Sequence, residues 1–369
     1  MRTDEKIMKM ALVHYWLTGM RGGERVLEEF CRLWPDADIF THAFNPAKIS
    51  PEIRKHKITC SFINCLPGAG EHCQRYLPLM PRALRQLDLS KYDLIVSSES
   101  GPAKGFRKPP HAFHVCYCHT PMRYLWDLYD DYYHHAGWSE KLAMSLFRRY
   151  LQNYDRRSAE TVDRFIANSH FVAERIKRIY GRDSTVIYPP VNTEFFRKGR
   201  GQQTLGDYYL FVGQLNHYKR PDLAVAICRQ MRRPLVVIGQ GPDAQQLRKL
   251  ADNHLPLIRF IEQVSDEELR NFYQGARSLL FPGIEDFGMV PVEAQAAGTP
   301  VIALRAGGAL ETVVDNQTGV FFDRPDLPSL GAAIESFETK KFSPEILQRH
   351  VEKFSISHFR EQILAAVKP

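Results

Sequence analysis

The residues best suited to chemistry lie in one stretch, residues 279 to 303, which reads LLFPGIEDFGMVPVEAQAAGTPVIA. An apolar strand runs into a loop that contains Glu285, and a helix predicted over residues 290–297 carries Glu293 in its first turn. The first amides of such a helix have no partner within it, so they favour binding of a phosphate group. The donors expected here are the backbone amides of Phe287, Gly288, Met289 and Val290.

The two carboxylates of this stretch differ in what they can reach. Glu285 can contact a group that extends beyond the phosphate, whereas Glu293 can accept hydrogen bonds from vicinal hydroxyls such as those of a ribose. In the alternative interpretation, Glu293 only complements the helix dipole and Glu285 is a solvated loop charge. We favour binding, because a strand end, several glycines and a helix start coincide at this point.

Glycines also end two other predicted strands. Gly239 and Gly241 permit a close approach of the backbone to a ligand, although alone they indicate only a turn. Gly22 and Gly23 precede a helix predicted from Glu24 and could place backbone amides against a phosphate or a sugar. This loop is neither Gly-x-Gly-x-x-Gly nor a Walker motif, which argues against a dehydrogenase and against an NTPase.

His119 directly follows a strand predicted over residues 113–118, so it is expected at the carboxyl end of that strand. It is interpreted as a contact to a transferred group, with a structural hydrogen bond as the alternative. His14 is as readily a core residue as a ligand contact. The side chains expected on the acceptor side of the site are His14, Arg123, Tyr124 and Trp126.

No metal site is predicted. Asp36 and Asp38 form an Asp-x-Asp pattern that is interpreted as a turn, because it lies outside the segments expected to bind a donor. The side chains of His134 and His135 should diverge, with no carboxylate or cysteine at metal-ligand spacing. Seven cysteines without a Cys-x-x-Cys pattern are typical of reduced thiols.

Short apolar runs alternate with helical patterns along the whole chain, which is typical of α/β domains with doubly wound parallel sheets. Pro189 and Pro190 interrupt this alternation with an extended connector. We therefore expect an N-terminal Rossmann-like, acceptor-binding domain over residues 1–186 and a C-terminal Rossmann-like, donor-binding domain over residues 187–345. A C-terminal helix over residues 346–369 should pack back on the N-terminal domain.

The Glu285-x7-Glu293 spacing resembles the signature of the retaining glycosyltransferases of family 4, which have the GT-B fold of two Rossmann-like domains facing a central cleft. FVGQLNHYKRPDLAV and VVIGQGP extend this resemblance. In the first half, similarity to bacterial mannosyltransferases that build O-antigen or exopolysaccharide is carried by LVHYWLTGMRGGERVLEE, YLPLMPRALRQLDLSKYDLIVSSESGPAKG, CYCHTPMRYLWDLYDDY and FIANSHFVAERIKRIYGRDSTVIYPPV.

The resemblance implies that Glu285 contacts the donor sugar, Glu293 the ribose, and Lys219 the diphosphate. Many relatives have Gly-Arg before this lysine, where this sequence has Gly213-Gln214. Arg220 or backbone amides should supply the missing charge. An exposed helix start at Lys219-Arg220 is the alternative. The residues implied around the nucleobase are Gly239, Gly241, Gln263 and Val264.

The implied reaction moves mannose from GDP-mannose to a lipid-linked (polyprenyl diphosphate) oligosaccharide, with retention and without a required metal or other cofactor. Glu285, His119 and Lys219 are the implied catalytic residues. Another GDP- or UDP-sugar and a GT-B epimerase are alternatives for the reaction. A basic protein that binds nucleic acid or a membrane surface is the alternative of a different class.

The net charge is +7, and residues 1–186 carry all of it, with 28 basic against 21 acidic residues. This asymmetry indicates an anionic partner, and no nucleic-acid recognition motif is present. The basic clusters are Arg54 to Lys57, Arg82 with Arg85, Lys104 to Lys108, Arg148-Arg149 and Arg156-Arg157.

Residues 137–154 predict a helix with an apolar stripe at every fourth position, made of Trp138, Leu142, Leu146, Tyr150 and Tyr154. A core position is favoured for this stripe, and docking on an anionic membrane is the alternative. No apolar run approaches the ~20 residues of a membrane span, and the N-terminus does not resemble a signal peptide. A cytoplasmic protein, peripheral at the inner face of the membrane, is therefore expected.

Overall fold

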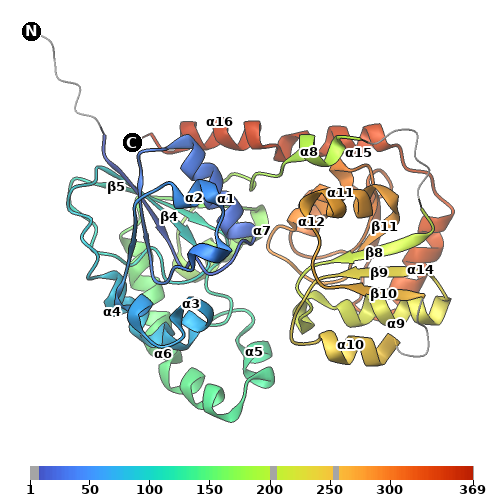
Figure 1. The fold of residues 1–369 in the computed structure, drawn as a ribbon, viewed down its shortest axis with the longest axis horizontal. Helices are drawn as coiled ribbons and strands as arrows, with labels where there is room; N and C mark the ends of the chain where they lie inside the picture. Colours follow the sequence, from blue (N-terminus) through green and yellow to red (C-terminus); the bar gives the residue numbers. More distant parts are fainter. Residues whose placement is uncertain (1–7, 200–205, 252–256, 369) are drawn as a thin grey trace, which may run out of the picture. The chain divides into compact units, whose positions relative to one another are not determined.

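The computed structural model describes residues 8–199, 206–251 and 257–368. The chain divides into two compact units, and each has its own sheet (Figure 1). The first unit comprises residues up to Tyr188 together with those from Arg360 onward, and the second comprises Pro189–Phe359.

The first unit is built on a seven-stranded parallel sheet with the order β3-β2-β1-β4-β5-β6-β7. The order reverses between β1 and β4, where Met10 pairs with Leu94 and His14 with Ser98. In such a sheet, ligands bind outside the carboxyl ends of the strands at the reversal. The strands are β1 (Met10–His14), β2 (Asp38–Thr41), β3 (Ile58–Cys60), β4 (Leu94–Glu99), β5 (Phe113–Cys118), β6 (Arg164–Ala167) and β7 (Ser184–Val186).

Helices connect these parallel strands, as parallel pairing requires. The α-helices are α1 (Gly22–Leu33), α2 (Pro51–Arg54), α3 (Ala69–His72), α4 (Met80–Leu84), α5 (Tyr129–His135), α6 (Trp138–Glu160) and α7 (His170–Tyr180). Short 3₁₀ helices are η1 (Pro46–Lys48), η2 (Phe62–Cys65) and η3 (Cys73–Leu79). Helix α1 begins at Gly22, two residues before the predicted start.

The second unit has a six-stranded parallel sheet with the order β10-β9-β8-β11-β12-β13, which reverses between β8 and β11. Its strands are β8 (Tyr208–Val212), β9 (Leu235–Ile238), β10 (Ile258–Ile261), β11 (Ala276–Phe281), β12 (Val301–Leu304) and β13 (Gly319–Phe322). Its helices are α8 (Thr193–Arg197), η4 (His217–Lys219), α9 (Pro221–Met231), α10 (Ala244–Ala251), α11 (Asp266–Gly275), α12 (Met289–Ala296), α13 (Ala309–Thr312), α14 (Leu327–Glu338), α15 (Pro344–Val351) and η6 (Glu352–Phe354).

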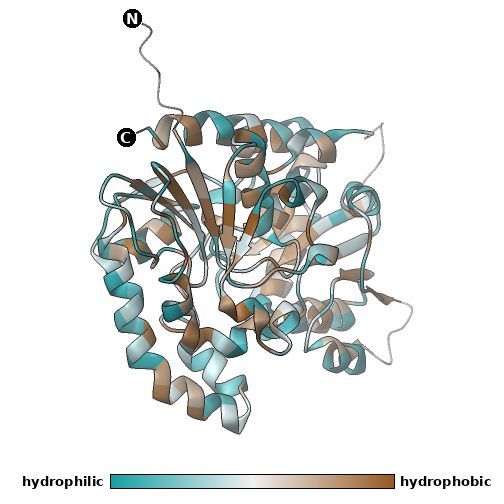
Figure 2. Cartoon of the chain, turned by 60° about the vertical axis from the view of Figure 1, so that its left-hand side comes forward, coloured by the Kyte–Doolittle hydropathy of each residue, from teal (hydrophilic) through white to brown (hydrophobic). Residues whose placement is uncertain are grey.

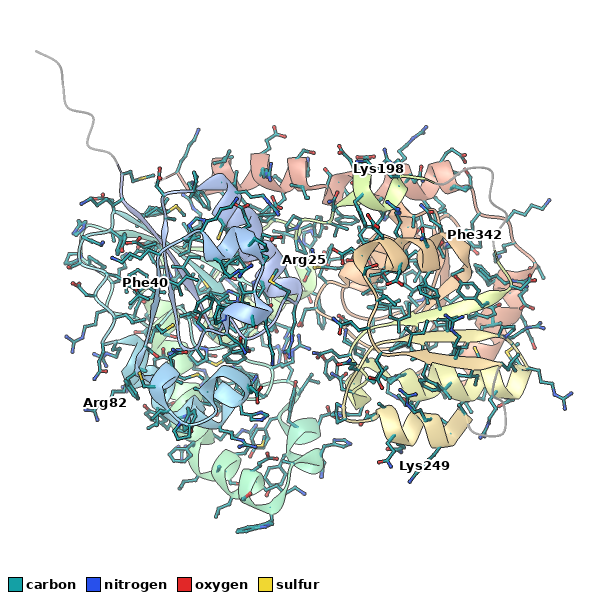
Figure 3. The ribbon with its side chains drawn as sticks, in the orientation of Figure 1. Arg25, Phe40, Arg82, Lys198, Lys249 and Phe342 are labelled. Carbon is teal, nitrogen blue, oxygen red and sulfur yellow. The ribbon has the colours of Figure 1, made fainter. Side chains whose placement is uncertain are left out.

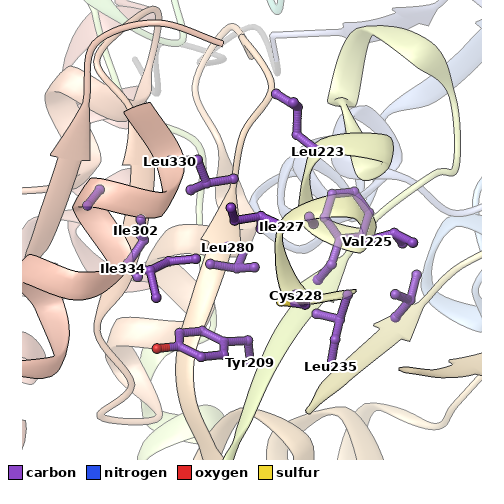
Figure 4. Close-up of a cluster of buried hydrophobic side chains, with 14 of the residues drawn as sticks. Tyr209, Leu223, Val225, Ile227, Cys228, Leu235, Leu280, Ile302, Leu330 and Ile334 are labelled. Carbon is purple, nitrogen blue, oxygen red and sulfur yellow. The ribbon is translucent and has the colours of Figure 1, made fainter. Parts of the chain in front are cut away.

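One hydrophobic core of the second unit lies between its sheet and helices α9 and α14. Leu280 of β11 and Ile302 of β12 pack there with Ile227 of α9 and Leu330 of α14, all fully buried (Figure 4). Parallel strands covered on both faces read as continuous apolar runs, and the four residues of β9 are all buried. The two sheets confirm the predicted α/β class with doubly wound parallel sheets.

The end of the chain forms two helices where one was expected. Helix α15 ends at Val351, and after η6 the chain continues as α16 (Ile356–Ala366). In the first unit, the Arg360 guanidinium donates to Glu29 of α1 at 2.7 and 2.9 Å. Arg164 also donates to the carbonyl of Lys368 at 2.9 Å. These contacts tie the last helix to the sheet and to α1.

Helix α6 is confirmed, but the stripe predicted to be core is not. Its buried residues all lie in the second half of the helix: Leu151, Asp155, Ser158 and Ala159. The stripe residues Trp138, Leu142, Leu146 and Tyr150 are instead exposed, and only Tyr154 turns inward. The periodicity predicts the helix, but the helix packs through a different face. Among the described residues, no helix has the length and apolar character that a bilayer crossing requires.

Lys104, a member of the basic cluster Lys104 to Lys108, differs from a surface cation. It is buried, and its Nζ pairs with Glu99 at the end of β4 and with Asp155 of α6, the latter at 2.5 Å. Trp126 Nε1 and the Tyr180 hydroxyl also donate to Asp155, at 2.7 and 2.8 Å. Burial of charge is tolerated only with such pairing. This lysine therefore anchors α6 to the sheet.

Candidate functional site

The main candidate site of the second unit lies at the reversal of its sheet. The loop after β8 leads to Lys219, and the loop after the neighbouring strand β11 carries Glu285. Lys219 Nζ donates to Glu285 Oε1 at 2.5 Å, with side chains that are 15% and 22% exposed. The structure thus brings together the two residues that the sequence predicted for the diphosphate and for the sugar. An ammonium can bind a phosphate, and a carboxylate can bind sugar hydroxyls.

Glycines allow the two loops to close around this pair. A Cβ on Gly283 would lie 2.6 Å from the Cα of Lys219, which is closer than real Cβ atoms approach. Gly213 has φ of 154°, and a Cβ there would press on the aliphatic part of the Lys219 side chain at 3.3 Å. The loop after β12 supports the backbone of Glu285, because the amide of Gly308 donates to the Glu285 carbonyl at 2.8 Å.

The loop after β9 supports the loop after β8. A Cβ on Gly239 would overlap the carbonyl of Gly213, and one on Gly241 would overlap the carbonyl of Leu215. The amide of Leu215 donates to the Gln240 carbonyl at 2.8 Å. Here the glycines serve backbone packing, and a ligand contact by Gly239 or Gly241 stays a prediction. Gln263 and Val264 lie in the next loop, at the carboxyl end of β10.

Helix α12 starts beside Glu285, one residue earlier than predicted. Gly288 precedes it with φ of 87°, a conformation that favours glycine, and Met289 is the first helical residue. Glu293 is therefore the fifth helical residue and not in the first turn, which corrects the prediction. Its Oε2 accepts a hydrogen bond from the Tyr273 hydroxyl at 2.8 Å. The ring of Phe287 is buried against Phe354, so only the backbone of Phe287 is available to a ligand.

Arg220 does not join the Lys219–Glu285 pair. It adopts φ of 55°, and its guanidinium donates to both carboxylate oxygens of Asp222, with the Nη2–Oδ2 distance at 2.9 Å. This pairing gives Arg220 a role at the start of α9, in line with the alternative of an exposed helix start. Gln214 is exposed. Compensation for the absent arginine by Arg220 or by backbone amides stays a prediction.

The candidate site of the first unit also lies at the reversal of its sheet. His14 ends β1, and its Nδ1 lies 3.0 Å from Ser98 Oγ on β4. Ser98 Oγ lies 2.8 Å from Nε2 of His119, which follows β5. The other ring nitrogen of His14 lies 3.7 Å from the buried carboxylate of Glu24 in α1. Strands β1 and β4, the end of β5 and helix α1 thus contribute to one row of polar side chains.

Sequence reasoning named the two histidines of this row but missed Ser98 and Glu24. Ser98 stands in the run SSES, where the pairing of β4 with β1 and β5 alone reveals its neighbours. Glu24 accepts a hydrogen bond from the Arg21 amide at 3.0 Å and so also shapes the Gly22-Gly23 loop. A Cβ on Gly23 would collide with the Tyr15 hydroxyl, which is why this loop needs glycine.

Two of the other residues predicted for the acceptor side pack against a buried cluster. Tyr124 and Trp126 pack around a cluster of Met122, Leu125 and Leu151. With its indole held by Asp155, Trp126 serves α6 packing. The roles of these two residues and of Arg123 in binding an acceptor stay predictions.

The motifs set aside as metal sites have other partners. Asp36 is exposed in a turn before β2, and Asp38 accepts hydrogen bonds from Tyr92 and, at 3.2 Å, from Lys91. His135 does have a carboxylate near it, which corrects the prediction: Asp131 Oδ1 lies 3.9 Å from its Nδ1, one turn earlier on α5.

Burial keeps three histidines of the first unit neutral. It lowers the pKa of His42 to about 4 and that of His114 to about 3. For His119, burial and the nearby His14 lower the pKa to about 3. The opposite effect applies to Glu99, where burial and the charge of Asp155, opposed by Lys104, raise the pKa to about 7.

These pKa values predict acid sensitivity. Between about pH 6.5 and 4.5 the unfolded chain protonates the three histidines and the folded chain does not, so the free energy of unfolding falls as the pH falls. Each histidine contributes about 1.4 kcal/mol per pH unit to this fall. Glu99 has the opposite effect, because over this range the folded chain holds its proton and the unfolded chain does not. The net slope of the free energy of unfolding is therefore about 3 kcal/mol per pH unit. Urea unfolding across this range measures the slope. His114→Asn should lower this slope by the contribution of one histidine. His111→Asn, at an exposed position, should leave the slope unchanged. Equal slopes in the wild type and both variants would contradict the pKa assignment.

Comparison with known proteins agrees with the two units. Residues 20–195 match the family described as Glycosyltransferase Family 4, and residues 192–354 match Glycosyl transferases group 1. The D-inositol 3-phosphate glycosyltransferase of Mycolicibacterium smegmatis is 28% identical over 236 residues, covering 58% of this chain and 54% of the relative. The Streptomyces scabiei protein of the same name is 33% identical over 217 residues, covering 46% and 49%. The chain thus spans about half the length of these relatives.

Similar solved structures cover nearly the whole chain. Anabaena HepE in complex with UDP-glucose has a TM-score of 0.70 at 16% identity, covering 97% of this chain and 98% of that one. WaaG, a glycosyltransferase involved in lipopolysaccharide biosynthesis, has a TM-score of 0.64 at 15% identity, covering 98% and 100%. The fold is GT-B, as the sequence predicted.

Proposed function

We propose that this chain, in which a Family 4-type domain is followed by a group 1 domain in the GT-B fold, is a retaining glycosyltransferase. The proposed reaction moves mannose from GDP-mannose to a hydroxyl of a lipid-linked oligosaccharide in surface-polysaccharide biosynthesis. The observation that carries the proposal is the Lys219–Glu285 pair at the reversal of the second sheet, beside the start of α12.

The proposed reaction mainly requires neutralisation of the negative charge that develops on the leaving diphosphate. The bond between the anomeric carbon and the diphosphate oxygen breaks, the acceptor oxygen bonds to the same face of that carbon, and the acceptor proton passes to the departing diphosphate. Lys219 and the amides at the start of α12 would stabilise the negative charge. Glu285 would orient the sugar, and Glu293 the ribose. No protein nucleophile and no metal is part of this proposal.

His119 has the protonation state that a neutral hydrogen-bond partner of the sugar needs. Its low pKa keeps the imidazole uncharged at neutral pH, and Ser98 and His14 hold its orientation. We assign it to the transferred sugar. His14, Arg123, Tyr124 and Trp126 are assigned to the acceptor side, where a polyprenyl diphosphate would bring the chain to a membrane surface.

A UDP-sugar is the second candidate donor. HepE has been solved with UDP and with UDP-glucose, and the relatives named above are D-inositol 3-phosphate glycosyltransferases, not mannosyltransferases. The loops after β9 and β10, proposed to surround the nucleobase, would decide between guanine and uracil.

A donor panel tests the proposal. The full chain is heated with GDP-mannose, GDP, UDP-glucose or UDP, and a ligand at a hundred times its dissociation constant should add about 2.7 kcal/mol of stability. GDP-mannose should stabilise most, and transfer to a lipid-linked acceptor should give a product of retained configuration with or without a chelator. Stabilisation by UDP-sugars alone would transfer the proposal to the second candidate. Stabilisation by none, or activity lost on chelation and restored by manganese, would contradict the proposed donor site or its metal-free chemistry.

A further inference from the structure

Helix α6 exposes an apolar stripe to solvent. Trp138 is 82% exposed, Leu142 64%, Leu146 70% and Tyr150 48%. Residues four apart lie on one face of a helix, so these side chains form one continuous surface. Figure 2 shows hydrophobic positions recurring along this helix between hydrophilic ones. Contiguous exposed apolar surface of this kind marks an interaction site.

The basic residues of α6 divide between its two sides. Arg148 lies over the ring of Tyr129 at 3.5 Å, and Arg156 over the ring of Trp126 at 4.7 Å, so both are used in packing the helix. Arg149 and Arg157 are exposed and stand seven residues after Leu142 and Tyr150, which places them beside the stripe. The face thus combines apolar residues, two of them aromatic, with arginines.

A cavity of about 910 Å³ continues this face, and Tyr150 belongs to both. Its lining brings together three basic clusters that are far apart in the sequence, and it contains no Asp or Glu. Arg82 is visible at the surface of α4 in Figure 3. The cations that line the cavity are Arg82, Arg85, Arg107, Lys108 and Arg157.

These cations are largely uncompensated. Lys108 pairs with Asp163, but within the described part of the chain Arg82, Arg85, Arg107 and Arg157 form no ion pair or hydrogen bond. Elsewhere in this unit, arginines such as Arg175 and Arg178 have carboxylate partners. Four unpaired guanidinium groups around one cavity favour a bound anion, and their planar donors match phosphate oxygens.

The cavity is distinct from the candidate site of the first unit. Lys108 precedes β5, and its partner Asp163 directly precedes β6. Both therefore lie at the amino ends of these strands, whereas His119 lies at the carboxyl end of β5. A ligand in this cavity is not positioned for the transfer reaction.

We propose that the outer face of α6 and the adjoining basic cavity dock the protein on an anionic phospholipid bilayer. The stripe enters the interfacial region, where Trp and Tyr side chains are favoured, and the cavity receives a lipid phosphate group. The choice of a membrane over another partner follows from the combination of apolar residues with unpaired arginines and no acidic lining. It rests on the proposed function only in that a lipid-linked acceptor requires a membrane surface.

Sedimentation with vesicles tests the proposal. The full chain should bind vesicles of phosphatidylcholine with phosphatidylglycerol, bind poorly to pure phosphatidylcholine, and be released by salt. Arg82→Ala/Arg157→Ala should weaken binding about tenfold or more, since each basic residue near an anionic surface contributes. The control Arg54→Ala/Lys57→Ala removes the same charge from exposed positions outside the cavity and should bind like the wild type.

A second pair of variants tests the stripe. Leu142→Ser/Leu146→Ser should lose vesicle binding, whereas Leu310→Ser/Ile346→Ser, at exposed apolar positions of the second unit, should not. Brominated lipids should quench Trp138 fluorescence, obtained by subtracting the spectrum of Trp138→Phe. Because all these positions are exposed, the variants should keep the folded circular dichroism spectrum.

Several outcomes would overturn the proposal. These are equal binding to neutral vesicles, equal loss in the control variants, stripe-dependent dimers in place of vesicle binding, or saturation by inorganic phosphate without vesicle binding. Donor-induced stabilisation, measured without lipid, separates this proposal from the proposed function. If the donor stabilises the chain and vesicles do not bind, only the docking proposal fails; in the reverse case, only the proposed reaction fails.

Discussion

Glu285→Gln is expected to lower the rate of sugar transfer by about a hundredfold or more while the chain stays folded. The amide keeps the shape of the side chain but removes the charge that is proposed to orient the sugar and that pairs with Lys219. The pair is partly exposed, so the loss of stability should be about 1 kcal/mol at most. Initial rates with saturating donor, together with thermal unfolding, measure both effects.

Glu335→Gln is the matched control for this variant. Glu335 is an exposed glutamate of α14 in the same unit, and its substitution should change neither rate nor stability. A folded Glu285→Gln protein with near-normal transfer would remove Glu285 from the site. A large loss of stability would instead make the Lys219 pair a structural contact.

Lys219→Met should weaken donor binding and turnover together, each by about ten- to a hundredfold, because it removes the charge-assisted hydrogen bond that Lys219 is proposed to donate to the diphosphate. Methionine keeps the aliphatic stem that packs on Gly213. Isothermal titration with the nucleoside diphosphate, and initial rates with the whole donor, separate binding from turnover. Lys249→Met, on the exposed face of α10, is the control.

The Lys219 variant also decides between two interpretations. A change in thermal stability alone, with normal binding, would make Lys219 only a structural residue at the end of η4. Because Lys219 and Glu285 contact each other, the double variant should cost less than the sum of the two single variants. Additive effects would mean that the pair acts independently on the ligand.

Arg220 shows that a basic residue next to a site in the sequence need not place its charge in that site. Sequence places Arg220 beside Lys219, yet the left-handed backbone at Arg220 lets Asp222 hold its guanidinium. Lys104 likewise belongs to a basic cluster in the sequence, yet it is buried between two carboxylates. Asp222 is a local partner that the backbone conformation at Arg220 brings into contact, whereas Asp155 lies 51 residues from Lys104 in the sequence and only the tertiary structure reveals it.

The sequence by itself determined the alternation of strands and helices, the two doubly wound sheets, and the loops that carry Lys219, Glu285 and His119. It could do so because burial of parallel strands and capping of helices leave local signals in residue type and spacing. Only the tertiary structure decided that Lys219 meets Glu285, since the order β8-β11 brings loops 66 residues apart together. It likewise decided that Ser98 links two histidines, and that the α6 stripe faces solvent beside a cavity of unpaired arginines. Periodicity shows that a helix has an apolar face, but which face the rest of the chain covers depends on packing between distant segments.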